Sequence, residues 1–115
     1  MWIMVSGPYT AGGANPSQRA TNLRAMNTAA VALFRRGHVP VIGVNMALPM
    51  IDAAGAVEFD GLMMPVSLAL AERCDACLRI GGPSNGADAE AEVFRRQGKP
   101  VFTALDQVPP ATGTA

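Results

Sequence analysis

The stretch Ala76-Cys77-Leu78-Arg79-Ile80-Gly81-Gly82-Pro83-Ser84-Asn85-Gly86 decides the fold class. Its first five residues are mostly apolar and are typical of a buried strand, and a glycine-rich loop follows them. Ser84 is a residue type favoured at helix N-caps, and a helix is predicted from there to Gln97, with Gly98 as its stop. A strand, a loop and a helix in this order form the repeating unit of α/β proteins.

The same unit is predicted elsewhere in the chain. Short apolar runs at residues 1–6, 39–43 and 100–102 predict three more strands. Asn15-Pro16 begins a helix that Gly37 ends, and a second helix is predicted from Gly61 or Pro65 to Arg73, with Val66, Ala69 and Leu70 facing inward. Residues 44–60 show no clear period and predict a short helix or an irregular excursion. One domain is expected over residues 1–108, with a mobile tail over 109–115.

Alternating strands and helices imply right-handed crossovers and parallel strands. The sequence therefore predicts a small flavodoxin- or Rossmann-like three-layer α/β sandwich with a mostly parallel sheet in the order 2-1-3-4. Strands 1 and 3 are neighbours in that order, and a ligand crevice forms where their connections diverge. The two most glycine-rich loops follow these strands, although such loops are often rich in glycine without binding anything. The candidate binding residues are Ser6, Gly7, Pro8, Gly82, Ser84, Asn85 and Gly86.

Composition excludes several classes of protein. The 115 residues carry no formal net charge, with 50% apolar and 16% charged residues, which argues against disorder and against a binder of duplex nucleic acid. Without a basic leader or a run of about 18 apolar residues, no membrane partner and a cytoplasmic location are expected. Two cysteines and one histidine predict no metal site, and no cofactor is expected. The low charge favours a homodimer or larger homo-oligomer, though a large core would also explain it.

Glu90 is the unusual residue of the last predicted helix. Ala87, Glu90, Ala91 and Phe94 recur at helical spacing, so the stripe that buries Phe94 turns Glu90 toward the sheet. Glu92 points the other way, as expected of a solvated face. A buried carboxylate costs several kcal/mol unless it is paired, and it tends to mark a site. The alternative is a solvated Glu90 at the edge of the crevice.

Four segments also carry a family resemblance: Ser6-Gly7-Pro8-Tyr9, Gly37-His38-Val39-Pro40, Cys74-Asp75 and Ser84-x-Gly86-x-x-x-Glu90. Over about residues 1–103 the chain resembles the nucleoside 2-deoxyribosyltransferase-like proteins, which include 2'-deoxynucleoside 5'-monophosphate N-glycosidases. The resemblance implies that Glu90 is a nucleophile that attacks the anomeric carbon, expels the base and forms a covalent ester. It also implies that Ser84 contacts a 5'-phosphate, so that the substrate is a nucleotide or nucleoside.

Two positions depart from the family pattern. Met4 stands where the family usually has a catalytic tyrosine, and Ser67 is the best match to a sugar-contacting aspartate. Tyr9, in the first loop, is a candidate replacement for the missing phenol. The departures leave open a non-catalytic nucleotide-binding module on the same fold. A nucleotide phosphoribohydrolase is a weaker alternative, for which Gly81-Gly82 is only a partial match.

Overall fold

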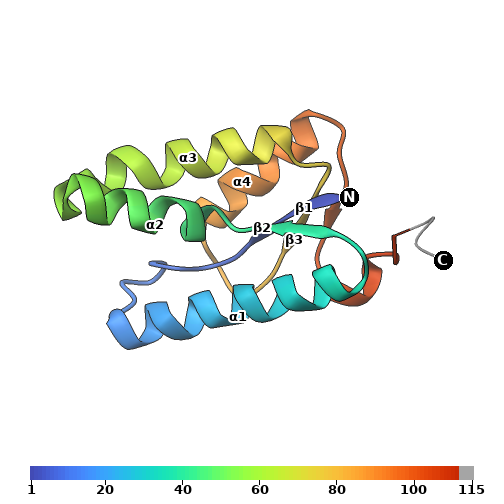
Figure 1. Ribbon diagram of the computed structural model, residues 1–115, viewed down its shortest axis with the longest axis horizontal. Coiled ribbons are helices and arrows are strands. Elements are labelled where there is room, and N and C mark those ends of the chain that lie inside the picture. The colour runs from blue at the N-terminus through green and yellow to red at the C-terminus, as the bar shows by residue number, and fades with distance from the viewer. Residues whose placement is uncertain (112–115) are drawn as a thin grey trace.

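A four-stranded parallel sheet organises the chain, as the computed structural model of residues 1–111 shows (Figure 1). In chain order the elements are β1 (Trp2–Ser6), α1 (Pro16–Arg35), β2 (Val39–Val41), α2 (Gly43–Ala54), the 3-10 turn η1 (Ala56–Glu58), α3 (Phe59–Arg73), β3 (Ala76–Arg79), α4 (Asn85–Arg96), β4 (Val101–Phe102) and the 3-10 turn η2 (Leu105–Gln107). The strand order is β2-β1-β3-β4, with every pairing parallel. The predicted three-layer α/β class and the order 2-1-3-4 are confirmed.

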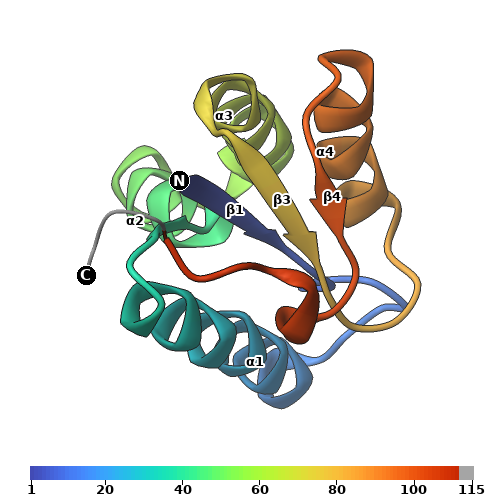
Figure 2. The ribbon, with the colours of Figure 1, turned by 90° about the vertical axis from the view of Figure 1, so that its right-hand side faces the viewer.

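The two faces of the sheet follow from alternation along β1. Ile3 and Val5 belong to the apolar cluster that includes α1, whereas Met4 packs with residues of α3 and α4. Figure 2 shows α1 on one side of the sheet and α3 and α4 on the other. Ser6 lies two residues after Met4 and therefore faces α3 and α4 as well.

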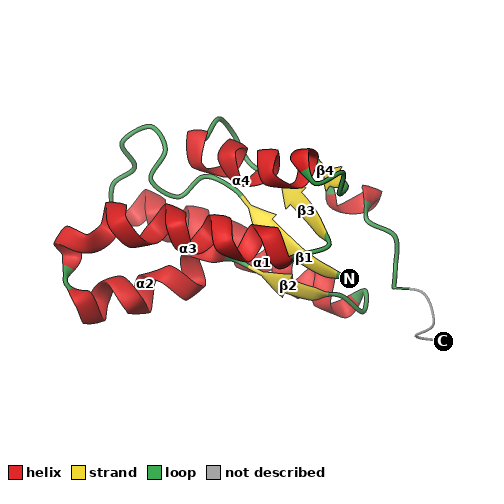
Figure 3. Cartoon of the chain, turned by 90° about the horizontal axis from the view of Figure 1, so that it is seen from above, coloured by secondary structure: helices red, strands yellow, loops and turns green. Residues whose placement is uncertain are grey.

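Residues 44–60, which had no clear period, form most of α2 and the turn η1. Helices α2 and α3 pack against each other as an antiparallel pair that extends beyond the carboxyl ends of the strands (Figure 3). Both contain an exposed interior proline, Pro49 and Pro65, where water can bond the carbonyl that the proline leaves free. Helix α3 begins at Phe59, so Pro65 lies within the helix and does not mark its start.

The buried face of α3 differs from the prediction. Met63, Ser67 and Ala71 are buried at four-residue spacing, whereas Ala69 is exposed and Val66 and Leu70 are half-buried. The difference arises because α3 packs between α2 and α4, so its innermost face is set by both neighbours. The inward face of this helix was predicted from apolar side chains alone. That criterion does not identify a face that carries a buried serine.

The C-terminal segment closes the α1 side of the sheet. Val108 is buried in the cluster around Ile3, and Arg36 Nη1 donates to the Val108 carbonyl oxygen at 2.6 Å. The Nε2 of His38 donates to the carbonyl oxygen of Pro109 at 2.7 Å. Of the tail expected over residues 109–115, positions 112–115 lie outside the described residues. Within residues 1–111, no helix combines the length and apolarity needed to cross a bilayer.

Gly43 lets α2 and α3 approach closely. A Cβ added at Gly43 would fall on the Ser67 hydroxyl and lie 2.7 Å from the Ser67 Cβ, closer than real side chains pack. We therefore expect Gly43→Ala to lower the free energy of unfolding by about 2 kcal/mol. Gly61→Ala on α3 is the matched control, because its Cβ would meet only Glu58 Oε2 at 3.6 Å. It should leave stability unchanged or raise it by up to about 1 kcal/mol. Urea unfolding measures both, and an unchanged Gly43→Ala would contradict the close packing.

Candidate functional site

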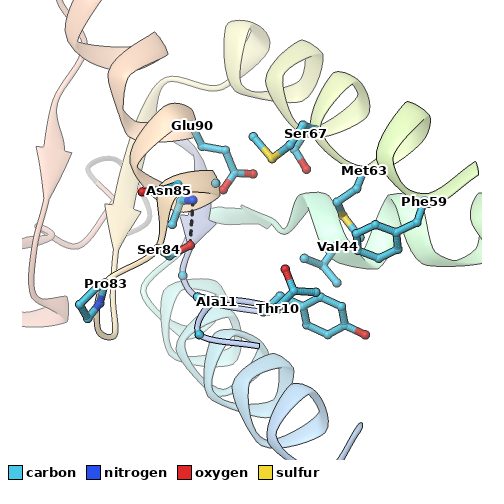
Figure 4. Close-up of a pocket in the computed structure, with 16 residues that line it drawn as sticks. Thr10, Ala11, Val44, Phe59, Met63, Ser67, Pro83, Ser84, Asn85 and Glu90 are labelled. Atoms are coloured by element: carbon cyan, nitrogen blue, oxygen red, sulfur yellow. Dashed lines mark hydrogen bonds between the residues drawn. The ribbon is translucent and has the colours of Figure 1, made fainter. Parts of the chain in front are cut away.

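A pocket of about 420 Å³ opens at the carboxyl ends of β1 and β3 (Figure 4). Three parts of the chain enclose it: the β1–α1 loop, the β3–α4 loop with the first turns of α4, and the α2–α3 pair. Its lining residues are Gly7, Tyr9, Thr10, Ala11, Gly12, Val44, Phe59, Met63, Met64, Ser67, Pro83, Ser84, Asn85, Gly86, Ala87 and Glu90. Its size and position are those of a small-molecule site at a switch point.

Glu90 lies in this pocket as the helical stripe predicted. The structure buries Ala87, Glu90, Ala91 and Phe94 together, and only 8% of Glu90 is exposed. Glu92, on the opposite face, pairs with Arg96 at 3.5 Å and Arg95 at 3.9 Å. Among the described lining residues, Glu90 is the one carboxylate, and none is a lysine, arginine or histidine.

Two buried hydroxyls face the Glu90 carboxyl. Ser6 at the end of β1 and Ser67 on α3 both favour its ionised form. Removal from water raises the pKa of Glu90, and the two hydroxyls and the Arg79 guanidinium oppose that change only in part. The resulting pKa is about 7. At neutral pH the carboxyl therefore exists in both protonation states.

The β3–α4 loop forms the polar end of the pocket. Ser84 caps α4 by accepting a hydrogen bond from the Ala87 amide at 3.2 Å, which confirms the predicted N-cap. Behind the loop, the Arg79 side chain is 12% exposed and contacts Asp88 at 3.0 Å and the Gly82 carbonyl oxygen at 2.9 Å. The free N–H groups and dipole of a helix N-terminus favour an anion, and Arg79 adds a fixed positive charge close by.

The opposite wall of the pocket is apolar. Val44 on α2 and Phe59 and Met63 on α3 lie across the opening from Ser84 and Asn85 (Figure 4). Thr10 and Ala11 of the first loop lie below the opening in this view, between Ser84 and Val44. A ligand that spans the pocket would meet the helix N-terminus at one end, apolar side chains at the other, and the carboxyl of Glu90 in a wall between them.

Not all of the predicted binding residues line the pocket. Gly7, Ser84, Asn85, Gly86 and the proposed catalytic Tyr9 and Glu90 do. Pro8 lines a separate hollow on the other side of the first loop, and Gly82 lines neither. Ser6 is 1% exposed and lies beneath Glu90 rather than in the pocket wall.

Sequence reasoning did not assign Phe59, Met63 or Met64 to the site, and it named Ser67 only as the position that matches a sugar-contacting aspartate of the family. The α2–α3 pair brings them there, and no local motif marks them. The spacing along the helix did provide a signal for Ser67. Residues four apart lie on the same face of a helix, so a helix that buries Met63 and Ala71 also buries Ser67.

The described residues contain no group of three or more histidine, cysteine, aspartate or glutamate side chains arranged to hold a metal ion. Cys74 and Cys77 are buried free thiols. Burial raises the pKa of Cys77 to about 11, so this thiol keeps its proton at neutral pH.

No protein-family model matches the chain, and no significant match was found among curated proteins.

The Glu90 carboxyl should make stability depend on pH. Its pKa of about 7 in the folded protein exceeds the 4.5 of an exposed glutamate, so wild-type stability falls as pH rises from 4.5 through 7. Glu90→Gln removes this loss and should raise the free energy of unfolding at pH 8 by roughly 3 kcal/mol. At pH 4.5 the gain should nearly vanish. Urea unfolding at the two pH values measures the difference, and an equal effect at both would show that Glu90 is not held in this way.

Proposed function

We propose that this protein cleaves or transfers the N-glycosidic bond of a (deoxy)nucleoside 5'-monophosphate-like substrate, through a covalent glutamyl-sugar intermediate on Glu90. The observation that carries the proposal is the buried Glu90 carboxyl in a pocket wall between a helix N-terminus and an apolar surface. The resemblance of the Ser84-to-Glu90 segment to the nucleoside 2-deoxyribosyltransferase-like family supports it.

The reaction takes two steps at the sugar C1' atom. Ionised Glu90 forms a bond to C1', while the C1'–N bond breaks and its electron pair leaves with the base, which takes up a proton. Water, or the nitrogen of a second base, then attacks C1' and displaces the carboxylate, and the attacking group loses a proton. This is the double-displacement logic of retaining glycosidases. Tyr9 lines the same pocket and is the phenol we assign to the site in place of the family tyrosine that Met4 replaces.

The substrate would lie with its phosphate at the start of α4. The Ser84 oxygen accepts a hydrogen bond from the Ala87 amide, so its own hydrogen is free to donate to a phosphate oxygen. The apolar wall of Val44, Phe59 and Met63 offers a surface for the flat face of a base. The reacting carboxyl is then between the two ends, where the sugar would lie.

A specific observation keeps a second function in view. Met4 and Ser67 are both buried and carry neither the phenol nor the carboxylate of the family pattern. A protein that binds nucleotides at this pocket without cleaving them would tolerate both replacements. In either case we infer a cytoplasmic protein that forms a homodimer or larger homo-oligomer. The exposed side chains of Trp2 and Phe34 support the oligomer by supplying apolar surface for a second copy.

The direct test is release of free base. Wild-type protein incubated with a panel of nucleoside 5'-monophosphates should release base, detected by chromatography. Glu90→Gln should lower the rate by at least about 10³-fold, because it removes the nucleophile. Glu92→Gln is the matched control: it lies on the same helix, faces solvent, and should release base at the wild-type rate. Thermal stabilisation by nucleotides without base release would support the binding module instead.

The phosphate end of the pocket has its own test. Ser84→Ala should lower kcat/KM about tenfold for the 5'-monophosphate, because a donor to the phosphate is lost. For the matching nucleoside, which has no phosphate, kcat/KM should change little. Loss of the helix cap would affect both substrates alike, so the ratio of the two values isolates the phosphate contact. If the ratio of the two kcat/KM values is the same in Ser84→Ala as in the wild type, Ser84 does not contact the phosphate.

A further inference from the structure

The guanidinium of Arg79 bonds to three parts of the junction between β3 and α4. Its Nε donates to Asp88 Oδ1 at 3.0 Å, and its Nη2 donates to the Gly82 carbonyl oxygen at 2.9 Å. Its Nη1 donates to the carbonyl oxygen of Ile80. One side chain at the end of β3 therefore bonds the beginning of the loop, the middle of the loop and the first turn of α4.

The Arg79 side chain is itself held by the sheet and by α4. Arg79 lies beside Ser6 in the register of β1 and β3, on the same face as Cys77, which packs with residues of α4. Its side chain is only 12% exposed. The N–H groups of a guanidinium have a fixed planar arrangement, so a side chain that cannot move also fixes the directions of its hydrogen bonds.

The loop that Arg79 bonds contacts the other loop of the pocket. Residues 81–83 are exposed, and Gly81 has a φ of 79°, a conformation that favours glycine. A Cβ added at Gly81 would lie 2.7 Å from Pro8 Cδ, so the two loops touch there. Exposed glycine-rich segments open readily unless bonds hold them. The bonds from Arg79 therefore fix where the loop places Ser84 and the start of α4.

We propose that Arg79 is a positioning residue of the site, and that its three hydrogen bonds hold the β3–α4 loop with Ser84 and the first N–H groups of α4 facing the pocket. This inference rests on the function proposed above, which places the substrate phosphate at that point. Arg79 does not line the pocket, so it acts through the loop and not by touching the substrate. A lysine has the same charge but carries it on a single nitrogen, so it cannot make the same three bonds.

Amide hydrogen exchange followed by NMR tests this role without any assay of activity. The Ala87 amide donates to the Ser84 hydroxyl at the start of α4, and the Gln18 amide donates to Asn15 Oδ1 at the equivalent position of α1. Arg79→Lys should speed exchange of the Ala87 amide about tenfold, because the loop loses hydrogen bonds from a charged group. The Gln18 amide should keep its wild-type rate, because its cap belongs to the other loop.

Two further variants complete the exchange experiment. Arg96→Lys, at an exposed position of the same helix, is the control and should leave the Ala87 rate at the wild-type value. Asp88→Ala removes the acceptor of Arg79 Nε from an exposed position, so it provides the test, with faster Ala87 exchange expected, if Arg79→Lys fails to fold. An unchanged Ala87 rate in the folded variant would overturn the proposal.

The rate of base release provides the second readout. Arg79→Lys should lower kcat/KM about tenfold for a nucleoside 5'-monophosphate and change it little for the matching nucleoside, which has no phosphate to be positioned. An equal loss with both substrates would assign Arg79 a merely structural role and overturn the proposal. Should the wild type release no base, the proposed function fails, yet exchange at Ala87 still decides whether Arg79 holds the loop.

Discussion

The burial of one carboxyl group constrains the rest of this structure. Taking Glu90 out of water opposes its ionisation, and the protein offsets that cost only in part, with two hydroxyls and a nearby guanidinium. Each of these groups comes from a different element: Ser6 from β1, Ser67 from α3 and Arg79 from β3. The carboxyl therefore reaches its environment only when the sheet and the helices over one face have assembled.

The topology explains why these elements meet. In the order β2-β1-β3-β4, the ends of β1 and β3 are adjacent, and their connections leave to opposite faces of the sheet. The β3–α4 loop then directs α4 across the face that Ser6 also occupies. The α2–α3 pair extends past the strand ends and encloses the pocket from the third side (Figure 3). Gly43, at the start of α2, decides how near Ser67 can come.

Prediction from sequence succeeded where the determinants are local. The parallel sheet follows from alternating elements, and the strand order is that of the flavodoxin-like pattern. The burial of Glu90 follows from the helical spacing of its own stripe, which includes Phe94. The role of Ser67 could not be obtained in this way, because it depends on how α3 packs between α2 and α4. Ser6 was found by its position in a glycine-rich loop, but its burial beneath Glu90 depends on β3 and Cys77, which lie more than 70 residues away.

Holding an acid with hydroxyls has chemical consequences that a charged partner would not have. A lysine or arginine in direct contact with Glu90 would lower its pKa well below neutrality and keep the carboxylate as an ion pair, with a weaker tendency to attack carbon. Hydroxyl donors leave the pKa near 7, so the ionised form is populated at neutral pH and remains basic. Arg79, the cation that favours the ionised form of Glu90, is bonded to Asp88 and the Gly82 carbonyl oxygen and lies outside the pocket lining. From there it favours negative charge at the start of α4 and on Glu90 without pairing directly with the carboxylate. One fixed charge can therefore favour both the phosphate of the proposed substrate and the ionised form of the proposed nucleophile.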